Sequence, residues 1–225
     1  MSRGASSEPR LVAAAALLFA ISLLAAPDAH AVGIAFGCIT HNRAADCGIG
    51  EAQLSAALGP AGDGRVRIDF QNAGADAVVV TRIVFQGPSL TGIVEILGTP
   101  SEVAFAAQSP AQNFPGGHAI LPAFEGDFEA AAAPPRAHSG MGAGESLAIV
   151  LAIASGLDFG DVVDALASGE LRIGLRAQAF VSGGSETLVN LPVHTPEPAT
   201  ALLLAAGSLA LGLRRRAGAW RHMPR

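Results

Sequence analysis

The apolar residues of this 225-residue chain are concentrated in two blocks, one near each end. The first block runs from Leu11 to Ala26 and the second from Ala199 to Leu213. Between them, residues 32–194 have the composition of an ordinary globular protein. At roughly 160 residues, this region is long enough to bury about 70 % of the surface that its unfolded chain would expose. The sequence therefore predicts one globular domain with an apolar segment on either side.

The N-terminal block has the features of a cleavable export signal. Arg3 and Arg10 precede it, Pro27 follows it, and the small residues Ala29 and Ala31 then fit the pocket of a signal peptidase. An uncleaved anchor or a buried helix is the alternative, but the block is short for a membrane span and a cleavage site follows it. We therefore expect residues 1–31 to form a signal peptide and its helix, and the mature chain to begin at Val32.

Charge is distributed unevenly along the chain. Residues 32–195 hold 16 Asp and Glu against 7 Arg, whereas the last 12 residues hold five Arg and no acid. A polyanion would be repelled by a domain of this charge, so nucleic acid is excluded as a partner. The basic tail is suited instead to an anionic membrane surface.

The two cysteines of the chain, Cys38 and Cys47, lie just after the predicted cleavage site. Export places them in an oxidising compartment, so we expect them to form one disulfide bond. A metal site that they would share with His41 is the alternative, but zinc sites usually pair cysteines two to four residues apart.

The middle region shows the patterns of short β-strands. Residues Arg65 to Asn72 alternate strictly between apolar and polar side chains, which predicts a half-buried strand. A turn at Asn72 to Asp76 predicts a hairpin to the next strand, Ala77 to Phe85, whose apolar side chains on both faces predict a central position. Further strands are expected at Gly92–Leu97, Glu102–Ala106, His118–Leu121, Phe124–Glu129, Ser146–Ala154, Glu170–Val181 and Glu186–Val193.

One short helix interrupts these strands. Asp158 is suited to cap its N-terminus, Asp161 lies in its first turn, and Gly169 ends it. Its buried stripe would consist of Phe159, Val162, Val163 and Leu166. Residues 130–144 read as a loop because they combine alanines, prolines and glycines. The fold class predicted is mainly β, an antiparallel β-sandwich with one short helix.

Two groups of residues have side chains that could carry out catalysis or bind a metal. Residues Gly144 to Ala148 resemble a nucleophile elbow around Ser146, with His118 or His138 as the base, but Ser146 opens a predicted strand and no helix follows it. Because an elbow needs a turn between a strand and a helix, we expect no catalytic residue here.

A second group of candidate residues is acidic. Glu125, Asp127 and Glu129 would share one face of a strand, where they could bind calcium or simply face solvent. The six histidines form no metal-binding motif, so no metal and no cofactor is expected. The chain has no Tyr and its one Trp, Trp220, lies in the tail, so a sugar site would have to use polar groups or Phe.

The C-terminal segment, residues 195–225, has three parts. Pro196, Glu197 and Pro198 come first, the apolar block follows, and Arg214, Arg215 and Arg216 close it. The apolar helix would span about 22 Å, which makes it a marginal transmembrane anchor against a hydrocarbon core of about 30 Å. The Arg cluster would stay in the cytoplasm and leave the domain outside.

This order of motif, hydrophobic helix and Arg-rich tail resembles the PEP-CTERM sorting signal of Gram-negative bacteria that make exopolysaccharide. The resemblance implies that an exosortase recognises residues 196–198 and transfers the protein to the cell surface or matrix. Residues Gly144 to Asn190 also resemble the extracellular region of uncharacterised PEP-CTERM proteins, which implies no activity. We therefore expect a non-enzymatic surface or matrix protein with exopolysaccharide as a partner; a secreted module that binds glycan or protein is the alternative, and a hydrolase the third.

Overall fold

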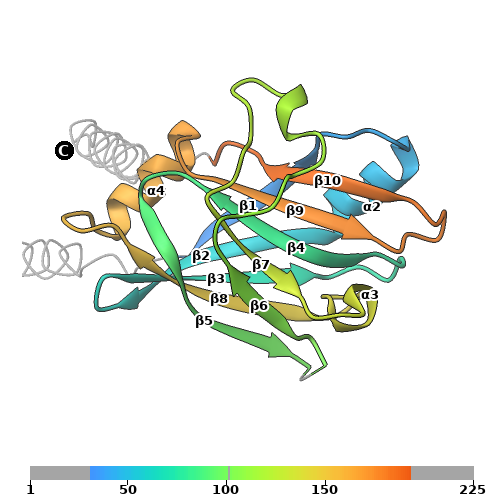
Figure 1. Cartoon of the computed structure of the whole chain (residues 1–225), viewed down its shortest axis with the longest axis horizontal. Helices are drawn as coiled ribbons and strands as arrows, with labels where there is room; N and C mark the ends of the chain where they lie inside the picture. Colours follow the sequence, from blue (N-terminus) through green and yellow to red (C-terminus); the bar gives the residue numbers. More distant parts are fainter. Residues whose placement is uncertain (1–30, 101, 194–225) are drawn as a thin grey trace, which may run out of the picture. The chain divides into compact units, whose positions relative to one another are not determined.

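Ten antiparallel strands form one continuous sheet in the computed structural model, which describes residues 31–100 and 102–193 (Figure 1). The order across the sheet is β5-β8-β3-β2-β1-β10-β9-β4-β7-β6. The strands are β1 (Val32–Cys38), β2 (Leu54–Gly62), β3 (Arg65–Asn72), β4 (Val79–Gln86), β5 (Leu90–Thr99), β6 (Phe105–Gln108), β7 (Phe128–Ala132), β8 (Ser146–Ile153), β9 (Arg172–Gln178) and β10 (Ser185–Asn190).

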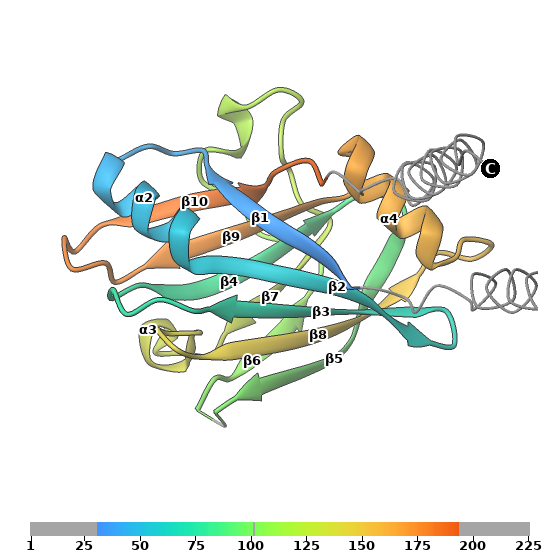
Figure 2. The same ribbon diagram turned by 180° about the vertical axis from the view of Figure 1, so that it is seen from behind.

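The strand β1 joins the two halves of this sheet. Its first residues pair with β2, with Val32 opposite Leu58, and its last residues pair with β10, with Phe36 opposite Asn190. The sheet curves so far that it is nearly closed, and its edge strands β5 and β6 lie near each other (Figures 1 and 2). The predicted antiparallel β fold is confirmed, but the two halves are one continuous sheet where a two-sheet sandwich was expected.

The core fills the space between the two halves of the sheet. On β3 the apolar side chains alternate as predicted, and Val66, Ile68 and Phe70 are fully buried. From the other half, Phe85 on β4 meets Phe70 edge to face with a centroid distance of 6.4 Å. Such an edge-to-face pair adds to the free energy gained by burying the two rings.

The predicted helix is confirmed as α4 (Phe159–Ser168). Asp158 caps it by accepting from the N–H of Asp161, and the Asp161 carboxylate accepts from the N–H of Asp158 in return. Gly169 ends the helix with a φ of 79°, a conformation that glycine adopts without strain. The other helices are α2 (Ala44–Gln53), α3 (Arg136–Ser139) and the 3-10 turn η1 (Gly117–Ala119).

A long segment without strands, residues 109–127, covers the outer face of β4 and β9. We call it the strap. Its rings Phe114 and Phe124 pack together, at a centroid distance of 4.8 Å, in a small apolar cluster with Val84 and Val189. The rings fit because β9 has Gly174 beneath them: a Cβ there would lie 2.5 Å from Phe114 Cζ.

Several sequence predictions about the fold are wrong. Of the predicted strands Glu102–Ala106 and Phe124–Glu129, only the last two residues of each lie in a strand. Residues 72–76 do not form a hairpin, because β3 and β4 belong to opposite halves of the sheet and the chain crosses between them. His118–Leu121 is no strand and contains η1, within the strap. The expected loop 130–144 begins with the three alanines that end β7, a strand that is buried on both faces.

Several elements were not predicted from the sequence, and two predicted helices lie outside the described residues. The strands β1 and β2 and the helices α2 and α3 were missed. The predicted signal helix and the predicted C-terminal helix lie outside the described residues, apart from Ala31. Within residues 31–100 and 102–193, no helix is long and apolar enough to cross a membrane.

Candidate functional site

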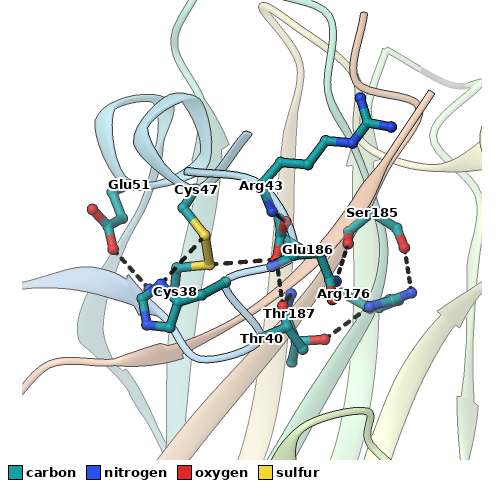
Figure 3. Close-up of a disulfide and its surroundings, with 11 residues drawn as sticks. Cys38, Thr40, Arg43, Cys47, Glu51, Arg176, Ser185, Glu186 and Thr187 are labelled. Atoms are coloured by element: carbon teal, nitrogen blue, oxygen red, sulfur yellow. Dashed lines mark hydrogen bonds between the residues drawn. A yellow bond between two sulfur atoms is a disulfide. The ribbon is translucent and has the colours of Figure 1, made fainter. Parts of the chain in front are cut away.

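The predicted disulfide between Cys38 and Cys47 is confirmed, and it links the end of β1 to α2 (Figure 3). The two Cα atoms lie 5.5 Å apart, within the usual range for a disulfide. His41 Nδ1 lies 3.7 Å from Cys47 Sγ, so the three side chains of the alternative metal site do lie together. The bond between the sulfurs leaves no thiolate for a metal ion.

Beside the disulfide, Glu186 is completely buried. Its carboxylate accepts from the Thr40 hydroxyl at 2.5 Å and from the N–H groups of Asn42 and Arg43 at 3.1 and 2.8 Å. A buried carboxylate is stable only where such donors replace its water. Glu186 thus fastens the loop after β1 onto β10 (Figure 3).

Arg176 on β9 extends this polar cluster. It donates to the hydroxyls of Thr187 and Ser185 at 3.0 and 2.6 Å (Figure 3). Burial lowers the pKa of the Arg176 guanidinium below its ordinary value, and the charge of Glu186 opposes that shift. The cluster is a closed network of hydrogen bonds, and it holds the β9–β10 hairpin to the N-terminal part of the domain.

A second buried charge lies beneath the strap. Glu129 on β7 is fully buried and forms an ion pair with Arg82 on β4. Arg82 Nε donates to Glu129 Oε2 at 2.9 Å, and its two terminal nitrogens donate to the carbonyls of Asn113 and Gln112. The pair therefore holds the first part of the strap, and neither charge is available to a ligand.

Arg172 holds the last part of the strap in the same way. It donates to the carbonyls of Pro122 and Ala123 and, at 2.8 Å, to Gln86 Oε1. Its guanidinium also lies 5.4 Å from the centroid of the Phe124 ring, a distance at which a cation and an aromatic face attract. Burial lowers the pKa of Arg172 from its ordinary value.

A groove opens beside Arg172, where the sheet fails to close. Its larger part has a volume of about 790 Å³ and lies between the start of β5, the strap and the turn before β9. A smaller part of about 260 Å³ continues along β5 and β6. Thr91, Ser109 and Phe128 line both parts, so we treat them as one seam groove. Its polar lining consists of Gln86, Thr91, Gln108, Ser109, Asp127, Glu170 and Arg172.

The acidic residues predicted to share one face of a strand do not do so. Glu129 is buried in its ion pair, whereas Glu125 and Asp127 are exposed in the strap, before β7 begins. The expectation of a solvated face is therefore wrong for Glu129. Among the described residues, the only close group of three metal-ligating side chains is Cys38, His41 and Cys47, whose two sulfurs are joined in the disulfide.

The other candidate residues lie apart in the fold. Ser146 is the first residue of β8, as predicted, while His118 lies in η1 and His138 in α3. Both histidines are exposed. The polar residues that the sequence analysis missed are Arg82, Arg172, Arg176 and Glu186. One signal was available: Arg82 stands inside an otherwise apolar strand, where a charge needs a buried partner.

The sorting residues Pro196, Glu197 and Pro198 and the cluster Arg214 to Arg216 lie outside the described residues. Comparison with protein families shows that residues 194–216 match the PEP-CTERM protein-sorting motif. The chain is thus one of the exported proteins that carry a C-terminal sorting signal. It is a PEP-CTERM domain-containing protein, with an exosortase as its processing partner at the membrane. No curated protein and no solved structure matches the chain.

Proposed function

We propose that this chain is a structural protein of the cell surface or extracellular matrix of a Gram-negative bacterium. The observation that carries the proposal is the sorting motif at residues 194–216. Pro196, Glu197 and Pro198 would be recognised by the exosortase while the apolar helix holds the protein in the inner membrane. Arg214 to Arg216 would remain in the cytoplasm.

The ends of the domain support a membrane-held intermediate. The strands β1 and β10 are antiparallel neighbours, so the start of β1 and the end of β10 lie at the same end of the sheet. The N–H of Leu191 still donates to the carbonyl of Ala35, and Val193 is buried. Only His194 and Thr195 separate this packed chain from Pro196, so the domain would be kept close to the membrane until it is released.

A non-enzymatic role is part of the proposal. The network around Glu186 uses its polar groups on each other, and the buried charge of Glu129 is paired with Arg82, as in structural clusters. Ser146 lies in a strand, where it lacks the strained turn of a nucleophile elbow.

A hydrolase would instead lose activity when Ser146, Glu125 or Asp127 is changed. A secreted binding module is the second candidate, and the seam groove favours it.

The test of sorting changes Glu197 alone. Glu197→Gln removes the charge between the two prolines and leaves the apolar helix and the Arg cluster intact. We expect this variant to stay in the inner membrane with its tail attached, as the unchanged protein should in a strain without the exosortase. Thr195→Val, just before the motif, is the control and should be processed normally. The mass and the membrane fraction of each protein are the measurements. Normal processing of Glu197→Gln, or loss of the tail without the enzyme, would contradict the proposal.

A further inference from the structure

The seam groove is formed by two edge strands that approach at one end and separate at the other. β5 pairs with β8 alone and β6 with β7 alone, so one edge of each faces the seam. The edges meet near the loop that joins them, where a Cβ on Gly98 would lie 2.0 Å from the carbonyl oxygen of Val103. Toward Thr91 and Ser109 they separate, and the groove opens.

An extended peptide is a poor occupant for this seam. Peptides add to a sheet by forming a regular ladder of hydrogen bonds with a free edge. The pairing of β5 is irregular at two places, between Leu90 and Gly92 and between Ile93 and Glu95, and β6 has four residues. Bulges and short edge strands are the features by which proteins prevent edge pairing.

A polyanion is also disfavoured. Asp127 and Glu170 are exposed carboxylates in the lining of the groove. Their only basic neighbour in that lining is Arg172, which already donates to Pro122, Ala123 and Gln86. A phosphate or uronate chain would meet more negative than positive charge here.

Neutral hydroxyl groups fit this lining well. Carboxylates accept hydrogen bonds from hydroxyls, and the Ser109 hydroxyl can donate as well as accept. The Thr91 hydroxyl donates to the carbonyl of Ala152 at 3.4 Å and can still accept, while the Gln86 amide, whose oxygen accepts from Arg172, can still donate. One Asp127 oxygen accepts from the N–H of Gly87 at 2.8 Å, which fixes the direction of the carboxylate. The prolines Pro88 and Pro122 supply apolar surface for sugar C–H groups. The volume of the larger part is within the usual range of ligand sites. Because the groove continues into the smaller part, its elongated form suits a chain of sugars better than a single compact molecule.

We infer that the seam groove binds a segment of neutral polysaccharide, through Thr91, Ser109, Asp127 and Glu170. This inference rests on the proposed matrix function and names the ligand class that would retain the domain there. Arg172 acts as a positioning residue, because its bonds to the strap set one wall of the groove. A glycan site of this kind needs no exposed Trp or Tyr.

The test is binding of the purified mature protein to an array of neutral, acidic and basic oligosaccharides and of extended peptides. We expect binding to neutral members with at least four sugars. Thr91→Trp, which fills the groove from an exposed position, should weaken that binding roughly tenfold or more, and Glu170→Ala should weaken it less. Ala143→Trp, an exposed change in the turn before β8, is the control and should bind as the unchanged protein does.

Three outcomes would overturn the inference: no binding to any neutral member, binding confined to acidic members or peptides, and neutral binding that Thr91→Trp leaves intact. Circular dichroism and the denaturation midpoint of each variant would show that a loss of binding is not a loss of fold. This binding experiment does not depend on sorting, because it uses purified protein. Sorting is tested separately with the Glu197→Gln variant. A sorted protein that fails to bind glycans would therefore contradict this inference alone.

Discussion

The carboxylate of Glu186 accepts a hydrogen bond at 2.8 Å from the main-chain N–H of Arg43, which is 143 residues earlier in the chain. The same carboxylate lies 3.6 Å from the sulfur of Cys38 (Figure 3). One acid near the start of β10 thus orders the segment between β1 and α2. The disulfide and the carboxylate hold the same short loop, one by a covalent bond and the other by hydrogen bonds.

Glu186→Gln should destabilise the domain by about 1–3 kcal/mol. An amide has one acceptor oxygen, so its NH₂ group would face a buried N–H or hydroxyl that now has no acceptor. Denaturation with urea measures the loss. Asp69→Asn is the matched control, because the ion pair of Asp69 with Arg67 is half exposed and should contribute less than about 1 kcal/mol. Equal effects of the two changes would show that the Glu186 network adds nothing.

Replacing both Cys38 and Cys47 by Ala should lower the free energy of unfolding by about 2–3 kcal/mol, because the bond closes a short loop in the unfolded chain. Urea denaturation with and without a reducing agent is the measurement. Reduction should destabilise the unchanged protein and leave the double variant unaffected. Peptide mapping without reduction should recover one linked pair, and free thiols in protein from the cell envelope would argue against it.

Arg82→Met should cost about 3–5 kcal/mol, since it leaves the charge of Glu129 buried without a partner. Changing Glu129 to Leu as well should restore much of that stability, because the buried charge is then absent. The double variant still lacks the bonds to Gln112 and Asn113, so the strap should be cut faster by proteases. A double variant no more stable than Arg82→Met would contradict this account.

Gly174→Ala should loosen the strap. Its methyl group would lie 2.5 Å from Phe114 Cζ and 2.9 Å from Phe124 Cζ, so the two rings must move. We expect a cost of about 1–3 kcal/mol and faster proteolysis within residues 109–127. Gly33→Ala on β1 is the control, because no atom lies within 4 Å of a Cβ at that position. Unchanged cleavage of the strap in Gly174→Ala would contradict the packing argument.

The mature protein should begin at Val32, after cleavage between Ala31 and Val32. Small residues at Ala29 and Ala31 suit the peptidase, and β1 starts with the next residue, Val32. N-terminal sequencing of the exported protein is the measurement. A surface form that begins at Met1 or Ser2 would show that the leader is not removed.

The sequence predicts best those elements whose pattern is set by one environment along their whole length. Strand β3 has one face in the core and one in solvent, and its alternation gave its limits correctly. Helix α4 carries its own capping residues, so Asp158 and Gly169 marked both ends. In each case local chemistry and tertiary packing agree.

Other elements depend on partners far away in the chain. β7 ends in three alanines, which form a strand because β4 and β6 lie on either side of it. β1 did show a signal, since Ile34, Phe36 and Cys38 alternate with small residues. The burial of Glu129 could not be predicted, because the strap that covers the outer face of its sheet is a loop with no regular pattern. The disulfide was predictable, whereas the Glu186 network depends on three donors from one irregular loop.

The central position of β1 has a consequence for translocation. An exported chain crosses the membrane from its N-terminus, so β1 crosses first, while its neighbour β10 crosses after almost all the rest of the domain. Phe36 pairs with Asn190, and until that partner emerges the two halves of the sheet have no strand in common. Contacts so distant in sequence form slowly and late. The topology therefore delays folding until the chain has been threaded through, which keeps it competent for secretion.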